Sequence, residues 1–150
     1  MSPSEPARGP FRVPIRVRYE ETDAAGVVYY ANYLRYFEVA RVEGLRALGM
    51  PIRAVEERGV LLPVVHAECS YKRPAHVDDL LEVLMWFESP GRSSFGFTYE
   101  VRRDDELLAK GRTRHAVIDR QTRRPLRIEG WMAEVLDGAG KWTRDEKAAH

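Results

Sequence analysis

The first apolar pattern in the chain is an alternation near its N-terminus. Every second residue from 11 to 19 is apolar, a period of two that predicts a strand with one buried face. Pro14 lies within this segment and cannot donate a ladder hydrogen bond, so we expect the strand at a sheet edge or in its opening turn. The preceding residues are rich in Pro, Ser and Gly without periodicity, and we expect a flexible arm over residues 1–10.

The longest pattern is helical. Apolar residues recur at spacings of three and four from about Tyr30 or Asn32 to Leu48, and Gly49 followed by a proline supplies a stop signal. Gly44 lies on the apolar face of this predicted helix, although glycine weakens a helix. We therefore expect a flat partner to pack closely against Gly44.

Four further apolar segments follow a link over residues 53–59, and each predicts a strand. They are Leu61–Lys72, Leu80–Glu88, Ser94–Arg103 and Leu107–Asp119, joined by turns rich in Pro, Gly and Asp. One long helix followed by an antiparallel meander indicates an α+β domain in which the sheet covers the helix. A short helix is predicted from Gly130 to Leu136, so we expect the domain to span residues 11–137, with a tail over residues 138–150.

Composition indicates one soluble globular domain. Of 150 residues, 44% are hydrophobic and 31% charged, which excludes a disordered polymer and a membrane protein. No apolar run is long enough to cross a bilayer, and the first residues lack the apolar core of a signal peptide, so we expect a cytoplasmic location. The single cysteine, Cys69, excludes an internal disulfide, and its neighbours predict a buried strand position.

The net charge and the histidines bear on whether the protein binds nucleic acid, acidic lipid or a metal ion. The net charge of +1 gives no overall attraction to nucleic acid or acidic lipid. Residues 92–127 nevertheless hold ten Lys or Arg against five Asp or Glu, which indicates either a solvated surface or a patch that receives phosphates. The four histidines share no short ligand spacing, so we expect no metal site.

The candidate chemistry lies in residues 19–33. Asp23 is followed by small residues, Ala24, Ala25 and Gly26, which let another molecule come close. The helix just downstream begins with unpaired backbone N–H groups and a dipole that favours negative charge. A carboxylate beside such an oxyanion site can hydrolyse an acyl group, and a thioester is the easiest target because its thiolate leaves readily. The alternative is that Asp23 is only a capping or turn residue.

The run from Asp23 to Tyr33 resembles the active-site signature of hotdog-fold thioesterases, in the group of 4-hydroxybenzoyl-CoA and Tol-Pal-associated acyl-CoA thioesterases. The order of strand, helix and strands matches from Phe11 to about Asp119. The resemblance implies a single hotdog domain, an antiparallel five-stranded sheet wrapped around one long central helix. It also implies an acyl-CoA thioesterase without a cofactor, forming a homodimer or homotetramer with active sites at the subunit interface.

The resemblance also implies roles for individual residues. Asp23 is the implied nucleophile or general base, and the backbone N–H of Tyr30 is the implied donor to the thioester carbonyl. The other implied substrate-binding residues are Gly26, Val27, Tyr29, Arg92, Ser93 and Ser94. The last three match the turn that meets the phosphates and pantetheine arm of the coenzyme, although Arg92 is equally explained as an exposed hairpin residue.

Several side chains keep two interpretations. His66 could face the acyl pocket across the interface, or could be a hydrogen-bonded strand residue. The tyrosines near the helix start could line an acyl or aryl pocket, whereas Phe37 is expected in the core. Two helix pairs, Glu38 with Arg41 and Glu43 with Arg46, are spaced for surface ion pairs.

The residue at position 30 bears on the identity of the acyl group but does not decide it. Tol-Pal-associated members usually have histidine at this position, whereas the 4-hydroxybenzoyl-CoA branch has tyrosine, so the acyl group is expected to be short aliphatic or aromatic. Two other functions remain as alternatives. A hotdog hydratase would need a catalytic histidine that this loop lacks, and a non-catalytic protein would bind acyl-CoA or acyl carrier protein without turnover.

Overall fold

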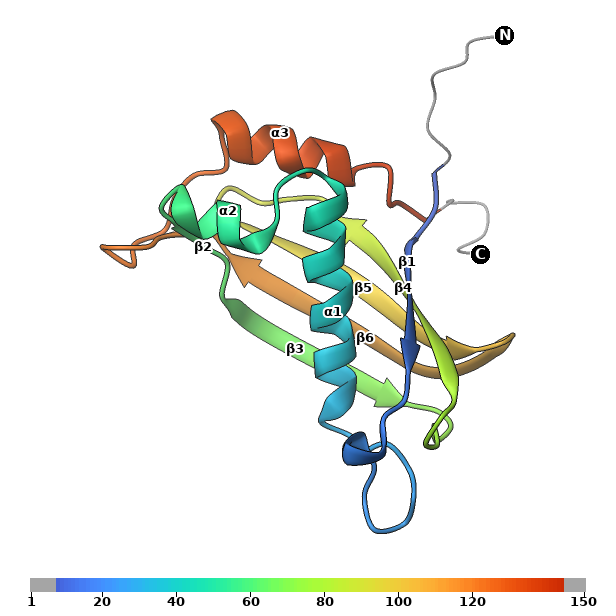
Figure 1. Ribbon diagram of the computed structural model, residues 1–150. Helices are drawn as coiled ribbons and strands as arrows, with labels where there is room; N and C mark the ends of the chain where they lie inside the picture. Colours follow the sequence, from blue (N-terminus) through green and yellow to red (C-terminus); the bar gives the residue numbers. More distant parts are fainter. Residues whose placement is uncertain (1–7, 145–150) are drawn as a thin grey trace, which may run out of the picture.

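A central helix, α1 (Asn32–Ala47), packs on one face of a five-stranded antiparallel sheet (Figure 1). The computed structural model describes residues 8–144. The five strands are β1 Phe11–Arg16, β3 Val64–Tyr71, β4 Leu80–Glu88, β5 Ser94–Arg103 and β6 Glu106–Ala116. One face of the sheet therefore wraps the helix, which confirms the predicted α+β hotdog architecture.

The strand order across the sheet is β1-β4-β5-β6-β3. The first strand lies at an edge, as Pro14 indicated, and pairs with β4. The prediction of a four-strand meander was wrong for β3, which pairs with β6 and not with β4. Between residues 72 and 79 the chain crosses from β3 at one edge to β4, which lies between β1 at the other edge and β5. Only β4, β5 and β6 form a meander.

Several element boundaries differ from the prediction for local reasons. Pro63 separates β2 (Val60–Leu61), which pairs with β7 (Ile118–Asp119), from the longer strand β3. The predicted link contains the helix α2 (Ile52–Glu57), which is too short to show a helical period. The N-terminal alternation ends early, because the 3₁₀ turn η1 (Tyr19–Glu21) follows β1 and leaves Tyr19 83% exposed.

The core lies between α1 and the sheet, and two glycines allow close approach there. The ring of Phe37 is fully buried and stacks on Tyr99 with 4.3 Å between centroids, which confirms its core position. A Cβ at Gly111 would overlap the ring of Phe37. A Cβ at Gly44 would lie 2.7 Å from the Cε of Met85 and 3.2 Å from the indole of Trp142, so this glycine packs closely against a methionine as well as a flat tryptophan ring.

Ordered packing continues past the predicted end of the domain. The helix α3 (Gly130–Ala139) runs beyond residue 137, and the side chain of Trp142 is buried. The N–H of Phe87 donates to the carbonyl of Trp142 at 2.6 Å, and the N–H of Gly9 donates to that of Lys141 at 3.1 Å. Residues 1–7 of the expected arm and 145–150 of the expected tail lie outside the described residues.

The strand β3 is exposed along nearly its whole length, because it forms one edge of the sheet. Cys69 is therefore only half-buried, and the predicted buried position was wrong. Val65 at the same edge is 62% exposed. Over residues 8–144, no helix is long and apolar enough to cross a bilayer.

Candidate active site

The Asp23 loop is a tight turn between η1 and α1. The N–H of Asp23 donates to the carbonyl of Val27 at 2.8 Å, and the N–H of Gly26 donates to the carbonyl of Asp23 at 3.0 Å. Gly26 has a φ of 83°, in the left-handed region where glycine is favoured. A Cβ at this position would meet no atom within 4 Å. The turn therefore favours glycine because of its backbone conformation and not because space is short.

The carboxylate of Asp23 is exposed and only partly engaged by this turn. Its Oδ1 accepts a hydrogen bond from the N–H of Ala25 at 2.8 Å, the geometry of an Asx turn, and a longer one from the N–H of Val27 at 3.4 Å. Its Oδ2 accepts no hydrogen bond from any residue that the structure describes. The N-cap of α1 is Ala31, so Asp23 does not cap the helix. The turn interpretation therefore accounts for one carboxylate oxygen and leaves the other available.

A backbone donor lies just before the first turn of α1. The N–H of Tyr29 donates to Glu21, and that of Asn32 donates to the carbonyl of Tyr29, each at 2.9 Å. Between them, the N–H of Tyr30 has no acceptor among the described residues. Such an unpaired N–H at the start of a helix, where the helix dipole is positive, can stabilise an oxyanion.

Asp23 and Tyr30 line the same open cleft, of about 350 Å³. The other residues that line it are Val27, Val28, Tyr33, Tyr71, Lys72, Arg73 and Pro74. The ring of Tyr33 is buried, whereas Tyr29 and Tyr30 are exposed. The cleft is thus lined by the residue with the unengaged carboxylate oxygen, the residue with the unpaired N–H, and aromatic side chains, at the end of the sheet where β3 finishes.

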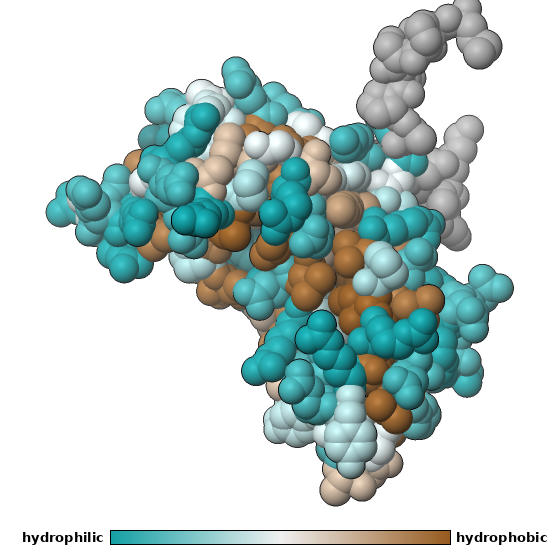
Figure 2. Space-filling model, viewed as in Figure 1, coloured by the Kyte–Doolittle hydropathy of each residue, from teal (hydrophilic) through white to brown (hydrophobic). Residues whose placement is uncertain are grey.

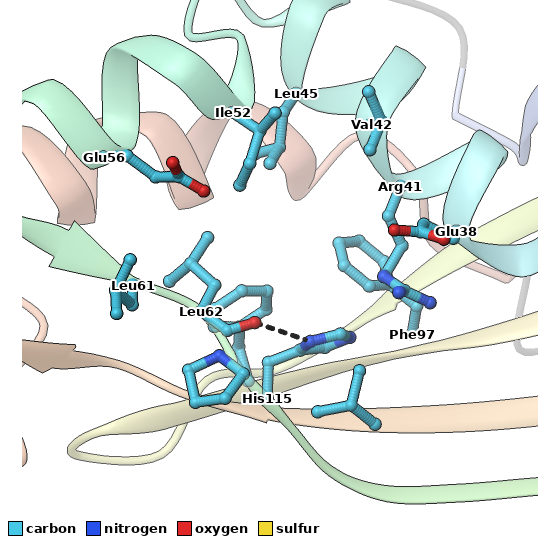
Figure 3. A pocket seen from close by; sticks show the side chains of 13 residues that line it. Glu38, Arg41, Val42, Leu45, Ile52, Glu56, Leu61, Leu62, Phe97 and His115 are labelled. Atoms are coloured by element: carbon cyan, nitrogen blue, oxygen red, sulfur yellow. Dashed lines mark hydrogen bonds between the residues drawn. The ribbon is translucent and has the colours of Figure 1, made fainter. Parts of the chain in front are cut away.

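A second cavity, of about 370 Å³, lies at the other end of the sheet, between α1, α2 and the start of β3 (Figure 3). Its walls are mostly apolar and include Val42, Leu45, Ile52, Leu61, Leu62, Pro63, Val64, Phe95 and Phe97. Three charged side chains, Glu38, Arg41 and Glu56, and the imidazole of His115 also line it. On the face seen in Figure 2, hydrophobic residues gather over α1 and beside it.

A buried chain of hydrogen bonds supports the floor of this second cavity. The Nδ1 of His115 is 3.4 Å from the carbonyl of Leu62, which can only accept, so this nitrogen carries the proton (Figure 3). The Nε2 then accepts from the hydroxyl of Thr113 at 2.9 Å, and that oxygen lies 2.7 Å from the hydroxyl of Tyr99. Burial and the nearby charge of Arg41 lower the pKa of His115 to about 4, so the imidazole is neutral at pH 7.

Comparison with known proteins shows the family of this chain. Residues 17–136 match the family model described as the thioesterase-like superfamily. The chain belongs to the thioesterase-like superfamily. It is 35% identical to a 1,4-dihydroxy-2-naphthoyl-CoA hydrolase of Synechococcus elongatus, over 81% of this chain and 93% of that protein. It is 38% identical to the acyl-CoA thioester hydrolase YbgC of Escherichia coli, over 65% and 73% of the two chains.

A solved thioesterase structure has the same fold. The DHNA-CoA thioesterase of Staphylococcus aureus superposes with a TM-score of 0.81 at 29% identity, covering 88% of this chain and 89% of that one. The predicted membership of the hotdog thioesterase family is thus confirmed. This homology also confirms the predicted enzyme class, a thioester hydrolase.

Within this thioesterase fold, the predicted site residues fall into two groups. Gly26, Val27, Tyr29 and Tyr30 lie with Asp23 in or beside the loop. Arg92, Ser93 and Ser94 precede or begin β5, at the opposite end of the sheet, where Ser94 pairs with Ala116. A single copy of the chain therefore does not bring these two groups together.

His66 lies apart from both groups. It pairs with Arg114 on β6, and paired residues of an antiparallel sheet point to the same face. Arg114 contacts Glu88 and alternates with the inward-facing His115, so His66 is on the face away from α1. Its Nε2 is 3.3 Å from Glu68 on the same strand, as the simpler interpretation expected.

The sequence did not indicate the second cavity or the role of Arg41 in its wall. The expected ion pair between Glu38 and Arg41 does not form, and the guanidinium of Arg41 instead lies 3.5 Å from the hydroxyl of Tyr99. The other expected pair, Glu43 with Arg46, is present at 3.3 Å.

The basic segment over residues 92–127 divides in two. Four of its arginines form ion pairs within the sheet: Arg102, Arg103, Arg112 and Arg114. Five others form no ion pair with any described residue: Arg92, Arg120, Arg123, Arg124 and Arg127. Arg120 lies near the second cavity, because its guanidinium donates to the carbonyl of Glu56 in the cavity wall, and the carbonyl of Arg92 accepts the N–H of Ile128. Within residues 8–144, no three His, Cys, Asp or Glu side chains gather as a metal ion would require.

Proposed function

We propose that this protein hydrolyses the thioester of an acyl-CoA, with the carboxylate of Asp23 as nucleophile or general base and the N–H of Tyr30 as the oxyanion donor. The observation that carries the proposal is the cleft itself, in a chain of the thioesterase family: Asp23, with an unengaged carboxylate oxygen, and Tyr30, whose backbone N–H has no acceptor among the described residues, both line it. Two relatives, a 1,4-dihydroxy-2-naphthoyl-CoA hydrolase and an acyl-CoA thioester hydrolase, support the same substrate class.

Two chemical routes fit this site. In the first, an oxygen of Asp23 adds to the thioester carbonyl carbon, the CoA thiolate leaves, and water hydrolyses the resulting acyl anhydride. In the second, Asp23 takes a proton from a water molecule whose oxygen attacks the carbonyl carbon directly. The N–H of Tyr30 would stabilise the negative oxygen in both, and both release a free acid and CoA.

The free edge of β3 supports a homodimer. An edge strand presents unpaired N–H and C=O groups that can pair with another strand. Two β3 strands that pair antiparallel about a two-fold axis would set Val64 of one copy near Tyr71 of the other. Val64 lines the second cavity and Tyr71 lines the Asp23 cleft, so the cleft of one copy would face the cavity of its partner.

This arrangement would complete the substrate site. The mostly apolar cavity of one copy would hold a short aliphatic or aromatic acyl group beside Asp23 of the other. Positive charge for the coenzyme phosphates would come from Arg92 and from the other arginines named above that form no ion pair with a described residue, Arg120, Arg123, Arg124 and Arg127. Ser93 and Ser94 would lie close by. A homotetramer would be two such dimers, and the cytoplasmic location stays a prediction from the sequence.

The function is tested by measuring thiol release from a panel of short aliphatic, long aliphatic and aromatic acyl-CoAs. We expect hydrolysis of at least one short or aromatic member. Binding of the panel without thiol release would instead identify a non-catalytic acyl-CoA protein. Addition of water to an enoyl-CoA, without release of thiol, would identify a hydratase.

The dimer is tested separately by light scattering on the purified chain. We expect a mass of two or four times 17.3 kDa. Val65→Lys places a charge on the exposed edge of β3 and should lower both the mass and the rate of thiol release. Leu80→Lys is the matched control, because Leu80 is also exposed but begins β4, and it should change neither. A monomeric wild-type protein with full activity would contradict the composite site.

A further inference from the structure

The direction of the Tyr30 N–H is set by the peptide group to which it belongs. That group joins Tyr29 to Tyr30, and its carbonyl accepts the N–H of Asn32 at 2.9 Å. In a trans peptide the N–H points opposite to the carbonyl. Because the carbonyl is directed towards the helix, the N–H of Tyr30 is directed away from it. Any rotation of this peptide group would change the direction of the donor.

Glu21 holds the residue on the N-terminal side of this peptide group. Its backbone carbonyl accepts the N–H of Tyr29 at 2.9 Å and the side-chain amide of Asn32 at 2.8 Å. Its carboxylate accepts the N–H of Arg18 at 2.8 Å and the hydroxyl of Tyr36 at 3.1 Å. Asn32 and the buried Tyr36 belong to α1, so two of these four hydrogen bonds tie η1 to the helix, and the one from Tyr29 ties it to the loop.

Tyr71 holds the residue on the C-terminal side, and it comes from a different part of the fold. Its hydroxyl, at the end of β3, donates to the carbonyl of Tyr30 at 2.9 Å. Its ring packs edge-on against Tyr33 at 5.2 Å and Tyr30 at 6.3 Å between centroids. Burial and the neighbouring Cys69 raise the pKa of Tyr71 to about 12, so its hydroxyl keeps the donated proton throughout the neutral range.

We propose that Tyr71 is a positioning residue for the oxyanion donor. Its hydroxyl fixes the Tyr30 carbonyl from the sheet side, while Glu21 fixes Tyr29 from the loop side, and the free N–H between them is thereby held in one direction. This inference rests on the proposed function, because it assigns Tyr71 a role in stabilising the same oxyanion. It also links β3, the proposed dimer edge, to the catalytic loop.

The test is Tyr71→Phe, which removes the hydroxyl and keeps the ring. Misplacing a catalytic group by about 1 Å can cost about a hundredfold in rate, and removing an oxyanion donor costs still more. Since Tyr71→Phe leaves the donor present but less fixed, we expect kcat to fall by about tenfold with KM within about twofold. Tyr19→Phe is the matched control, because Tyr19 is 83% exposed and its hydroxyl has no partner among the described residues. It should leave both constants unchanged.

A second measurement does not depend on turnover. The amide of Ala31 belongs to the same peptide group as the Tyr30 carbonyl, so loss of the Tyr71 hydrogen bond should change its ¹H–¹⁵N chemical shift. We expect this change in Tyr71→Phe and not in Tyr19→Phe, with the amides of the α1 core at their wild-type positions.

Three results would overturn the inference in an active enzyme. Wild-type kcat in Tyr71→Phe would show that the hydroxyl positions nothing, and a raised KM with unchanged kcat would make Tyr71 a substrate contact. Loss of activity together with shifts throughout the core would make its role structural. A wild-type protein that hydrolyses no acyl-CoA would instead refute the proposed function, which separates the two failures.

Discussion

The shape of the Asp23 loop depends on Gly26, and a pair of substitutions at this position tests how firmly the loop is held. Gly26 has a φ of 83°, and a Cβ there would meet no atom within 4 Å. The cost of a side chain is therefore conformational and not steric. Valine and asparagine are similar in size, but only asparagine readily adopts the left-handed region. Gly26→Val should strain the loop by about 2 kcal/mol, and Gly26→Asn by much less.

Three hydrogen bonds of 3.0 Å or less oppose relaxation of the strained loop. They join Asp23 to Val27 at 2.8 Å, Gly26 to the carbonyl of Asp23 at 3.0 Å, and Ala25 to Oδ1 of Asp23 at 2.8 Å. At about 1 kcal/mol net each, they exceed the strain by about 1 kcal/mol. About one molecule in six of the Gly26→Val variant would then relax. We expect kcat within about twofold of wild type, and a free energy of unfolding lower by about 2 kcal/mol.

The assays are thiol release and thermal unfolding of the two variants. A loss of about 2 kcal/mol corresponds to about 4–8 °C in Tm for a chain of this size. We expect this decrease for Gly26→Val and a much smaller one for Gly26→Asn. A Gly26→Val variant that keeps its Tm but loses more than about tenfold in kcat would show that the three hydrogen bonds do not hold the loop. An equal decrease in both variants would show that side-chain size, not backbone conformation, sets the cost.

Three further predictions concern the coenzyme, the core and pH. Arg92→Ala should raise KM for acyl-CoA more than for a truncated pantetheine thioester, and equal effects on steady-state KM would remove Arg92 from the phosphate site. Gly111→Ala forces its Cβ into the ring of Phe37 and should lower the free energy of unfolding by about 1–3 kcal/mol in urea titration; wild-type stability would contradict this packing. The folded-state pKa of His115 is lowered to about 4, so the unfolded chain binds more protons between pH 4 and 6.5. Stability should fall by up to about 3 kcal/mol as pH drops through this window, and urea titrations of His115→Gln should show a smaller fall.

The sequence predicted those elements whose pattern is local. The long helix was found because its buried residues, such as Phe37, Ala40 and Gly44, keep a helical spacing. The strands were found from their alternation, except where Pro63 divides one of them. The strand that pairs with β3 was predicted wrongly, because the local sequence of a strand does not determine whether it pairs with β4 or β6. That choice depends on β1 occupying the edge of β4.

The Asp23 loop was identified from its residues and from the family resemblance, whereas the second cavity was not. The sequence did contain one signal for the cavity. The basic residues Lys110, Arg112 and Arg114 alternate along β6, which indicates that His115 points inward. The cavity itself could not be predicted from the sequence, because its walls come from segments that are distant along the chain, including α1, α2 and β5. The free state of the Tyr30 N–H also required the structure, because it depends on which acceptors its neighbours use.

The most direct test of the central claim is the rate of thiol release by Asp23→Asn, measured on the acyl-CoA that the wild type hydrolyses fastest. Asparagine keeps the size of the side chain and its Oδ1, which can still accept the N–H of Ala25, but it is neither a nucleophile nor a base here. We expect a loss of about a thousandfold or more in kcat, with Tm close to wild type. An Asp23→Asn variant that releases thiol at the wild-type rate would contradict the central claim.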